Sequence, residues 1–473
     1  MEQTARTTNV TVLNRKALST LHRIMVAVVL VAVISGVAYS LGFFNRPPKA
    51  AFTYRTLTRT LRYIAPTDQD TIVFQNESSD TETPLEKLIS TWYVRYNGTG
   101  DWKPLNSSTH YRGRLPVSNE KGHEIRLVVS DGSKEDSTSV TIPVDQATLY
   151  PLKRVGMRFK GVNYMIGHRF EDKLYPPTSE LEMEESLEVI RNDLGCNAIK
   201  FVGDYEDVLV KAAEIAMRKR YEMIIISPRY WHKTAKEDYT IDEHVEKVVL
   251  FSQSAEKLRE MSSTIVLCIG EELEFGIRGI TNSSTYDQRV AEYGAMTSKQ
   301  KNDIVLSKLR DYLSTMIREV RKYFHGKITY AHTGSTAYRF NYAEFDLDIV
   351  GPMLYWYPDE RGFSRKVAQF RVLGKPYVST EFGCHCWKGA MNVSGSAWQY
   401  YKDQEYSQEE QAVCIVRTMN IYLSNGLDGA FVFIWMRRQP NDARSYGIVR
   451  YYGDGKLLTR KLGFYAFQSF IVS

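Results

Sequence analysis

Cysteine is scarce in this sequence. The 473 residues include five cysteines, all in the C-terminal two thirds of the chain: Cys196, Cys268, Cys384, Cys386 and Cys414. So few and such scattered cysteines exclude a disulfide-dense scaffold, although they allow one or two bridges. Cys196 and Cys268 lie in apolar, strand-like contexts, so we expect both to be small buried hydrophobic residues.

Long basic runs with interleaved aromatic residues are also missing. The formal net charge of +6 is mild, and we therefore expect no nucleic acid partner. Aromatic residues, by contrast, are plentiful: they make up 12% of the chain and include 31 tyrosines. Flat rings stack on sugar faces but also fill protein cores, and composition alone favours the core.

One segment is free of charge and long enough to span a membrane. Residues 25–44, "MVAVVLVAVISGVAYSLGFF", have roughly the 20-residue length of a transmembrane helix. Arg15, Lys16 and Arg23 precede it, which favours a short cytoplasmic N-terminus at 1–24. Basic residues follow it as well, and the run is long for a cleaved signal peptide. We predict an uncleaved signal anchor in the cell membrane, single-pass, with the bulk of the chain extracytoplasmic.

Acceptor motifs for N-linked glycans follow this segment. Five Asn-x-Ser/Thr sequons are present, at Asn76, Asn97, Asn106, Asn282 and Asn392. Each motif alone is weak, but together they favour an extracytoplasmic location and predict N-glycans.

Residues 45–149 have the rhythm of an all-β domain. The segments "TIVFQNESSD", "LISTWYVRYNGTGDW" and "HEIRLVVSDGSKEDSTSVTIPV" alternate apolar and polar positions before turn residues, which predicts a β-sandwich. This region resembles the polycystic-kidney-disease-type (PKD) immunoglobulin-like module, with Trp92 as its core tryptophan. The resemblance implies a spacer or binding surface without catalysis.

Residues 150–473 change to a repeated alternation of strands and helices. Continuous apolar runs predict strands buried on both faces; they lie at 159–164, 197–202, 223–228, 264–270, 327–331, 347–354, 376–380 and 429–435. Helix-period segments separate them. Eight such units predict an α/β fold of the (β/α)₈ TIM-barrel type. The alternative is an open doubly wound sheet, but no glycine-rich phosphate loop follows the first strand.

Glutamates occur where the predicted strands end. The fourth strand ends in "GEELEFG", with Glu271, Glu272 and Glu274, and the seventh ends in "TEFG", with Glu381. In a (β/α)₈ barrel chemistry takes place at these carboxyl ends. Strands four and seven lie across the barrel from each other, so two of these carboxylates can face one substrate.

These motifs resemble glycoside hydrolase clan A. "GEEL" followed later by "TEFG" is closest to the branch of the clan that contains the β-mannanases. The resemblance implies that Glu272 is the acid/base and Glu381 the nucleophile of a retaining glycosidase. Their carboxyls should then lie about 5 to 5.5 Å apart.

The same resemblance implies further site residues. Tyr355 corresponds to a tyrosine that hydrogen-bonds the nucleophile, although a core aromatic residue is the other interpretation. Trp435 corresponds to the sugar platform of strand eight, and Lys200 stands where many members have arginine. Further substrate-binding candidates that could equally pack in the core are Trp231, His232 and His332, with Tyr230 beside them.

Glu271 departs from the pattern of the clan, which commonly has asparagine there to hold a sugar hydroxyl. As a carboxylate, Glu271 could accept from that hydroxyl and raise the pKa of its neighbour by repulsion. It could also face away and pair with a basic residue.

The "CHC" of Cys384, His385 and Cys386 raises the question of a metal site. Three ligands so close in sequence cannot easily turn toward one ion, and no second Cys/His pair has zinc-site spacing. We expect no metal and no cofactor; a loop disulfide or free thiols fit better. Trp387, in the same loop, is a candidate for stacking on sugar or for loop packing.

The sequence therefore predicts a membrane-anchored retaining glycosidase. Its substrate would be a β-linked oligo- or polysaccharide, with a mannan or glucan as the first expectation. Two alternatives remain: a non-catalytic carbohydrate-binding or adhesion protein, and a transglycosylase that remodels surface glycans.

Overall fold

The computed structural model describes most of the chain. The described residues are 46–57, 63–170, 173–234, 237–334, 340–395, 404–436, 446–452 and 457–472. The predicted N-terminal segment 1–24 and membrane anchor 25–44 lie outside them, and among the helices that are described none has the length and hydropathy of a membrane span. The chain divides into two compact units. One contains residues 46–57 and Asp70–Val144, and the other contains residues 63–69 and the described residues from Asp145 onward.

The first unit consists of two antiparallel sheets. One has the order β1 (Phe52–Thr56), β2 (Ile72–Asn76) and β5 (His110–Gly113); the other has the order β4 (Lys103–Asn106), β3 (Ile89–Arg95), β6 (His123–Ser130) and β7 (Glu135–Ile142). Burial alternates along β3 and β6 because each strand turns one face to the core. Phe74 of one sheet and Trp92 of the other belong to the same hydrophobic cluster, so the prediction of a core tryptophan is confirmed.

One predicted glycan acceptor lies in this core. Asn76 is buried, and its amide donates a hydrogen bond to Ser90 Oγ at 2.8 Å while its Oδ1 accepts one from Ser78 N. A glycan on this nitrogen would break that bond and find no room, so the acceptor at Asn76 is contradicted. Asn106, Asn282 and Asn392 are exposed, and Asn97 is partly exposed.

The second unit is a barrel of eight parallel strands. Its strands are β9 (Phe159–Met165), β12 (Ala198–Gly203), β13 (Met223–Pro228), β14 (Ile265–Glu271), β15 (Lys327–Ala331), β16 (Ile349–Val350), β17 (Val378–Phe382) and β18 (Gly429–Val432). They are hydrogen-bonded in the order β16-β15-β14-β13-β12-β9-β18-β17. Parallel bridges Val350–Tyr377 and Met353–Glu381 join the two ends and close the barrel.

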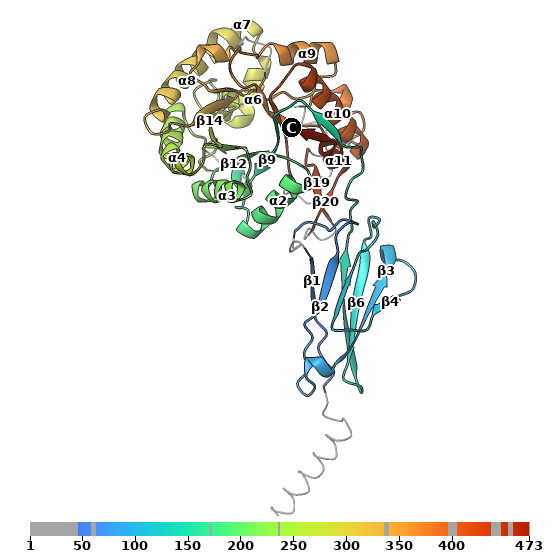
Figure 1. Ribbon diagram of the computed structural model, residues 1–473. Helices are drawn as coiled ribbons and strands as arrows, with labels where there is room; N and C mark the ends of the chain where they lie inside the picture. Colours follow the sequence, from blue (N-terminus) through green and yellow to red (C-terminus); the bar gives the residue numbers. More distant parts are fainter. Residues whose placement is uncertain are drawn as a thin grey trace, which may run out of the picture. The chain divides into compact units, whose positions relative to one another are not determined.

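Helices follow the strands and surround the barrel (Figure 1). They are α2 (Glu180–Asn192), α3 (Glu206–Arg218), α4 (Ile241–Met261), α5 (Leu273–Gly276), α6 (Tyr286–Ala295), α7 (Ser298–Gln300), α8 (Ser307–Val320), α9 (Glu360–Ala368), α10 (Gln408–Ser424) and α11 (Leu462–Gln468). Side-chain caps begin several of them, for example the capping box of Thr240 and Glu243 at α4.

The predicted (β/α)₈ barrel is confirmed, and each predicted strand has a counterpart. The sixth is much shorter than predicted: 347–354 contains only β16, Ile349–Val350. Pro352 explains this, because proline has no N–H to donate to a neighbouring strand. Smaller pieces complete the unit: the hairpin β10 (His168–Phe170) and β11 (Lys173–Tyr175), the pair β8 (Lys153–Val155) and β21 (Phe470–Val472), and the pair β19 (Val449–Tyr452) and β20 (Leu457–Arg460).

Two layers of hydrophobic side chains hold the barrel together. Alternate strand residues such as Ala198, Ile225, Cys268 and Phe431 fill its interior, and the residues between them pack in a separate cluster with the helices. This division follows from the two-residue period of strands. Cys196 and Cys268 are buried free thiols, as predicted.

Candidate active site

Polar side chains replace the apolar ones of the inner layer at the carboxyl ends of four strands. Lys200 follows Ala198 by two residues in β12, and Ser227 follows Ile225 by two in β13, so both continue the inward-facing rows. The register of β14 shifts between Cys268 and Glu271, and that of β17 shifts between Ser379 and Phe382. Such irregularities re-aim side chains, and Glu271 and Glu381 here come together on one lysine.

Lys200 bridges these two carboxylates. Its Nζ lies 2.6 Å from Glu271 Oε1 and 2.9 Å from Glu381 Oε1, and the lysine is fully buried. Burial by itself acts to lower the pKa of Lys200, but the two carboxylates outweigh it and hold the pKa above its ordinary value. Lys200 therefore stays charged and holds the ends of β14 and β17 at fixed positions.

Glu381 has a second partner in Tyr355. The Tyr355 hydroxyl donates to Glu381 Oε2 at 2.9 Å, while Lys200 donates to the other oxygen. Burial raises the pKa of Glu381, and Lys200 and Tyr355 act against this increase by stabilising the carboxylate form. The predicted contact between Tyr355 and Glu381 is thus present.

Glu271 turns inward and pairs with a basic residue. Besides the contact with Lys200, its Oε1 accepts a hydrogen bond from Ser227 Oγ at 2.6 Å. Its backbone carbonyl accepts one from Trp231 Nε1 at 3.2 Å. Glu271 therefore pairs with a basic residue, as one of the two alternatives predicted. It does not face away from the site, as that alternative assumed.

Glu272 has a different environment. Its backbone is left-handed, with φ of 42° and ψ of 40°, at the N-cap of α5, a conformation that side chains seldom adopt. Burial raises the pKa of Glu272 to about 8, and the charge of Glu381 adds to the increase, while Arg229 opposes it. The two predicted catalytic carboxyls thus lie close enough to interact, and Glu272 is protonated at neutral pH.

Three of the predicted sugar-contacting residues are instead packed in the protein. His332 is fully buried with its Nε2 3.2 Å from Glu274 Oε1, and burial lowers the pKa of His332 to about 4. Trp231 is buried, stacked on Tyr286 and bonded to the carbonyl of Glu271. Direct sugar contact by Trp231 and His332 is therefore contradicted, because no face of either ring is accessible. Trp387 is likewise buried.

Trp435 is also not a platform. It lies three residues beyond β18, fully buried, and its Nε1 donates to Ser186 Oγ of α2 at 3.2 Å. The prediction of a sugar platform at Trp435 is therefore wrong. Phe433, which is only partly buried, takes a position beside the site, with its ring 6.3 Å from that of Tyr355.

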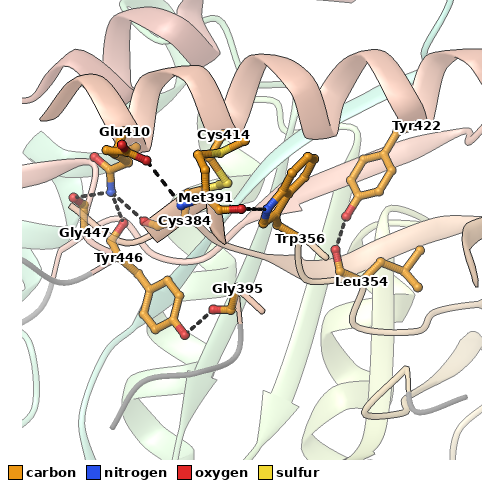
Figure 2. The surroundings of a disulfide bond; sticks show 11 residues. Leu354, Trp356, Cys384, Met391, Gly395, Glu410, Cys414, Tyr422, Tyr446 and Gly447 are labelled. Atoms are coloured by element: carbon orange, nitrogen blue, oxygen red, sulfur yellow. Dashed lines mark hydrogen bonds between the residues drawn. A yellow bond between two sulfur atoms is a disulfide. The ribbon is translucent and has the colours of Figure 1, made fainter. Parts of the chain in front are cut away.

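The loop after Glu381 is tied to α10 (Figure 2). Cys384 forms a disulfide with Cys414, and Gln411 donates to the carbonyls of Cys384, Tyr446 and Gly447. The expected loop disulfide is thus present, while Cys386 stays a free buried thiol beside Lys461. Among the described residues no group of three or more His, Cys, Asp or Glu side chains is placed to hold a metal ion.

Sequence reasoning missed three residues of the site: Ser227, Arg229 and Phe433. Ser227 and Arg229 flank Pro228, the last residue of β13. Because a barrel has its functional groups at the carboxyl ends of its strands, this position could have identified both residues. Phe433 directly follows β18, but the nearby tryptophan was the more conspicuous aromatic residue.

Comparisons with known proteins show no family for this chain. No family model and no curated protein matches this chain. Among solved structures, the β-D-glucuronidase of Dictyoglomus thermophilum is 11% identical, with 90% of this chain and 68% of that chain covered and a TM-score of 0.40. A family 39 glycoside hydrolase of Bacteroides cellulosilyticus is 11% identical (86% and 80% covered, TM-score 0.42). A family 1 β-glucosidase of Thermotoga maritima is 12% identical (67% and 98% covered, TM-score 0.44). Likenesses this distant do not assign an activity to the chain.

Proposed function

We propose that the chain is a retaining glycoside hydrolase. The observation that carries the proposal is the pair of interacting carboxyls at the ends of β14 and β17, of which Glu272 is protonated at neutral pH and Glu381 is held by a cation and a hydroxyl. Two carboxyls whose environments separate their protonation states are what acid and nucleophile roles require.

The mechanism has two displacements. In the first, Glu381 attacks the anomeric carbon while Glu272 gives its proton to the leaving oxygen, so that the glycosidic bond breaks as a glycosyl ester forms. In the second, the now ionised Glu272 takes a proton from water, the water oxygen attacks the same carbon, and Glu381 leaves as a carboxylate.

The other polar residues of the site position Glu381. Lys200 and Tyr355 occupy one oxygen each, which fixes the rotation of the carboxyl group and stabilises its charge before attack. Glu271 keeps Lys200 charged and centred between the two strands.

The finer parts of the proposal rest on the sequence. We place the protein in the cell membrane through residues 25–44, with the barrel outside and the all-β unit as a PKD-like spacer. The substrate is a β-linked glycan of mannan or glucan type, in keeping with the "GEEL" and "TEFG" motifs.

Trapping of the covalent intermediate tests this proposal. The chain should turn over aryl β-mannosides or β-glucosides, and a 2-deoxy-2-fluoroglycosyl fluoride of the active sugar should label the peptide that contains Glu381. Nuclear magnetic resonance should show a β-anomer as the first product. An α-anomer, or a chain that hydrolyses none of a broad panel of β-glycosides, would refute the proposal. A dominant transfer product with added sugar acceptor would favour a transglycosylase.

A further inference from the structure

A cavity lies beside the acids, at the ends of the neighbouring strands. Its volume is about 330 Å³, within the usual range for small-molecule sites, roughly 300 to 1,000 Å³. Its walls come from the β10–β11 hairpin, the residues after β12 and β13, and helix α4; they include Arg169, Asp204, Tyr230, His232, Tyr239 and Lys247.

Asp204 is a polar group of this cavity with unused hydrogen-bonding capacity. Its Oδ2 accepts a hydrogen bond from Arg169 N at 2.5 Å, whereas its buried Oδ1 has no partner among the described residues. A buried carboxyl oxygen without a donor is costly unless a ligand supplies one. Arg169 and Lys247 place donor groups around the same space.

The remaining walls are aromatic and well fixed. The rings of Tyr230 and Tyr239 meet edge to face, with centroids 6.1 Å apart. His232 is held by Asp238, with Nδ1 to Oδ1 at 2.5 Å, and Asp238 is held in turn by Arg289 at 2.7 Å. His232 lines this cavity, and its contact with a substrate stays a prediction.

The cavity adjoins the catalytic acids. Tyr230 and His232 flank Trp231, whose indole nitrogen bonds to the carbonyl of Glu271. Burial raises the pKa of Asp204 to about 7, with a further small increase from the charge of Glu271. Trp231 therefore links the wall of this cavity to the backbone of Glu271.

The mixture of groups identifies the ligand class. Sugar hydroxyls both donate and accept, and rings of tyrosine suit the apolar faces of a pyranose. The acids Asp204 and Glu206 are accompanied by basic residues in the same lining, Arg169, Lys233 and Lys247, so the cavity does not require a charged ligand. We infer that this cavity is a second saccharide subsite, which binds a neutral pyranose unit next to the one that is cleaved, through Asp204, Arg169 and the tyrosines. This inference rests on the proposed function, because it assumes a glycan in the adjoining site.

Equilibrium binding tests the inference without relying on turnover. Isothermal titration would use the full chain carrying Glu381→Gln and a panel of β-1,4-linked gluco-, manno-, galacto- and xylo-tetraoses. Adding Asp204→Asn should raise the Kd of the bound tetraose about tenfold or more, as loss of a charge-assisted hydrogen bond does. Arg169→Gln should act in the same direction. The matched controls Asp311→Asn and Arg318→Gln, at exposed positions on α8, should leave the Kd unchanged.

Each outcome has a defined meaning. Equal Kd values with and without Asp204→Asn, in variants that keep the parent's melting temperature, overturn the subsite, as does the failure of every tetraose to bind. Hydrolysis by the wild-type chain together with indifference to Asp204→Asn leaves the proposed function standing and removes the inference. If binding depends on Asp204 but the wild-type chain hydrolyses nothing, the subsite stands and the proposed function is removed.

Discussion

Glu381 and Glu272 end two strands of the same barrel but differ in the side chains that contact them. Glu381 lies within β17, has a partner on each oxygen, and continues into a loop that the Cys384–Cys414 disulfide ties to α10. Glu272 lies just beyond β14 on a left-handed backbone, and burial together with the charge of Glu381 raises its pKa to about 8.

The difference shows how one residue type takes two chemical roles. A carboxyl that a lysine and a tyrosine stabilise is suited to attack as an anion, and a partly buried one beside a negative charge is suited to give a proton. In the mechanism that we propose, the partners of the two glutamates therefore decide which one is the nucleophile and which is the acid.

Removal of either carboxyl gives the largest expected effect. Glu381→Ala should reduce kcat by about 10⁴-fold or more, and Glu272→Ala by about 10² to 10⁴-fold with poor leaving groups. Azide should rescue both variants but give different products: an α-glycosyl azide with Glu381→Ala and a β-glycosyl azide with Glu272→Ala. The same azide anomer from both variants would show that the two roles are not distinct.

Loss of the Lys200 cation, which bridges Glu271 and Glu381, should have the second largest effect. Lys200→Met leaves Glu271 and Glu381 buried without their counter-charge, which costs about 3 to 5 kcal/mol of unfolding free energy when one partner of a buried pair is removed. Denaturant unfolding measures this loss, and kcat should also fall because Glu381 loses its charge stabilisation. Lys211→Met provides the control, since Lys211 pairs with Glu180 and Glu214 on the surface. A Lys200→Met variant as stable as the Lys211→Met variant would contradict the bridge.

The raised pKa of Glu272 predicts an alkaline limit of activity. The acid role needs the protonated form, which is present below the pKa, so kcat/KM for substrates with poor leaving groups should be retained at neutral pH. It should fall about tenfold per unit as pH rises above about 8. In Glu272→Gln this limb should disappear. An alkaline limb that persists in Glu272→Gln would assign the titration to another group.

The disulfide should affect the stability of the fold more than the catalytic activity. Cys384 and Cys414 close a loop of 30 residues, and opening it through Cys384→Ser with Cys414→Ser should lower the unfolding free energy by about 3 to 4 kcal/mol. Thermal melting, compared with that of Cys386→Ser, measures the change. Activity at 25 °C should change within about threefold, because Lys200 and Tyr355 still hold Glu381. A loss of kcat as large as that of Lys200→Met would make the disulfide the main support of Glu381.

Much of the molecule follows from the sequence alone. Continuous apolar runs separated by helix-period segments predict a parallel sheet covered by helices, because strands buried on both faces need helices to cover them, and eight such runs favour a barrel. The end of a strand is visible where such a run stops, so Glu272, Glu381 and Tyr355 could be assigned from their positions to the rim at the carboxyl ends of the strands.

Only the tertiary structure decided which of the other residues belong to the site. A strand alternates its side chains between the interior and the helices, so a shift of one residue reverses a side chain. Such shifts precede Glu271 and Glu381, and no periodicity in the sequence marks them. Trp435 is buried against α2 and Phe433 lies beside Tyr355, because the chain beyond β18 no longer follows the alternation of the strand. Lys200 contacts Glu271, which is 71 positions away in the sequence, and Glu381, which is 181 positions away. Only closure of the barrel brings these residues together.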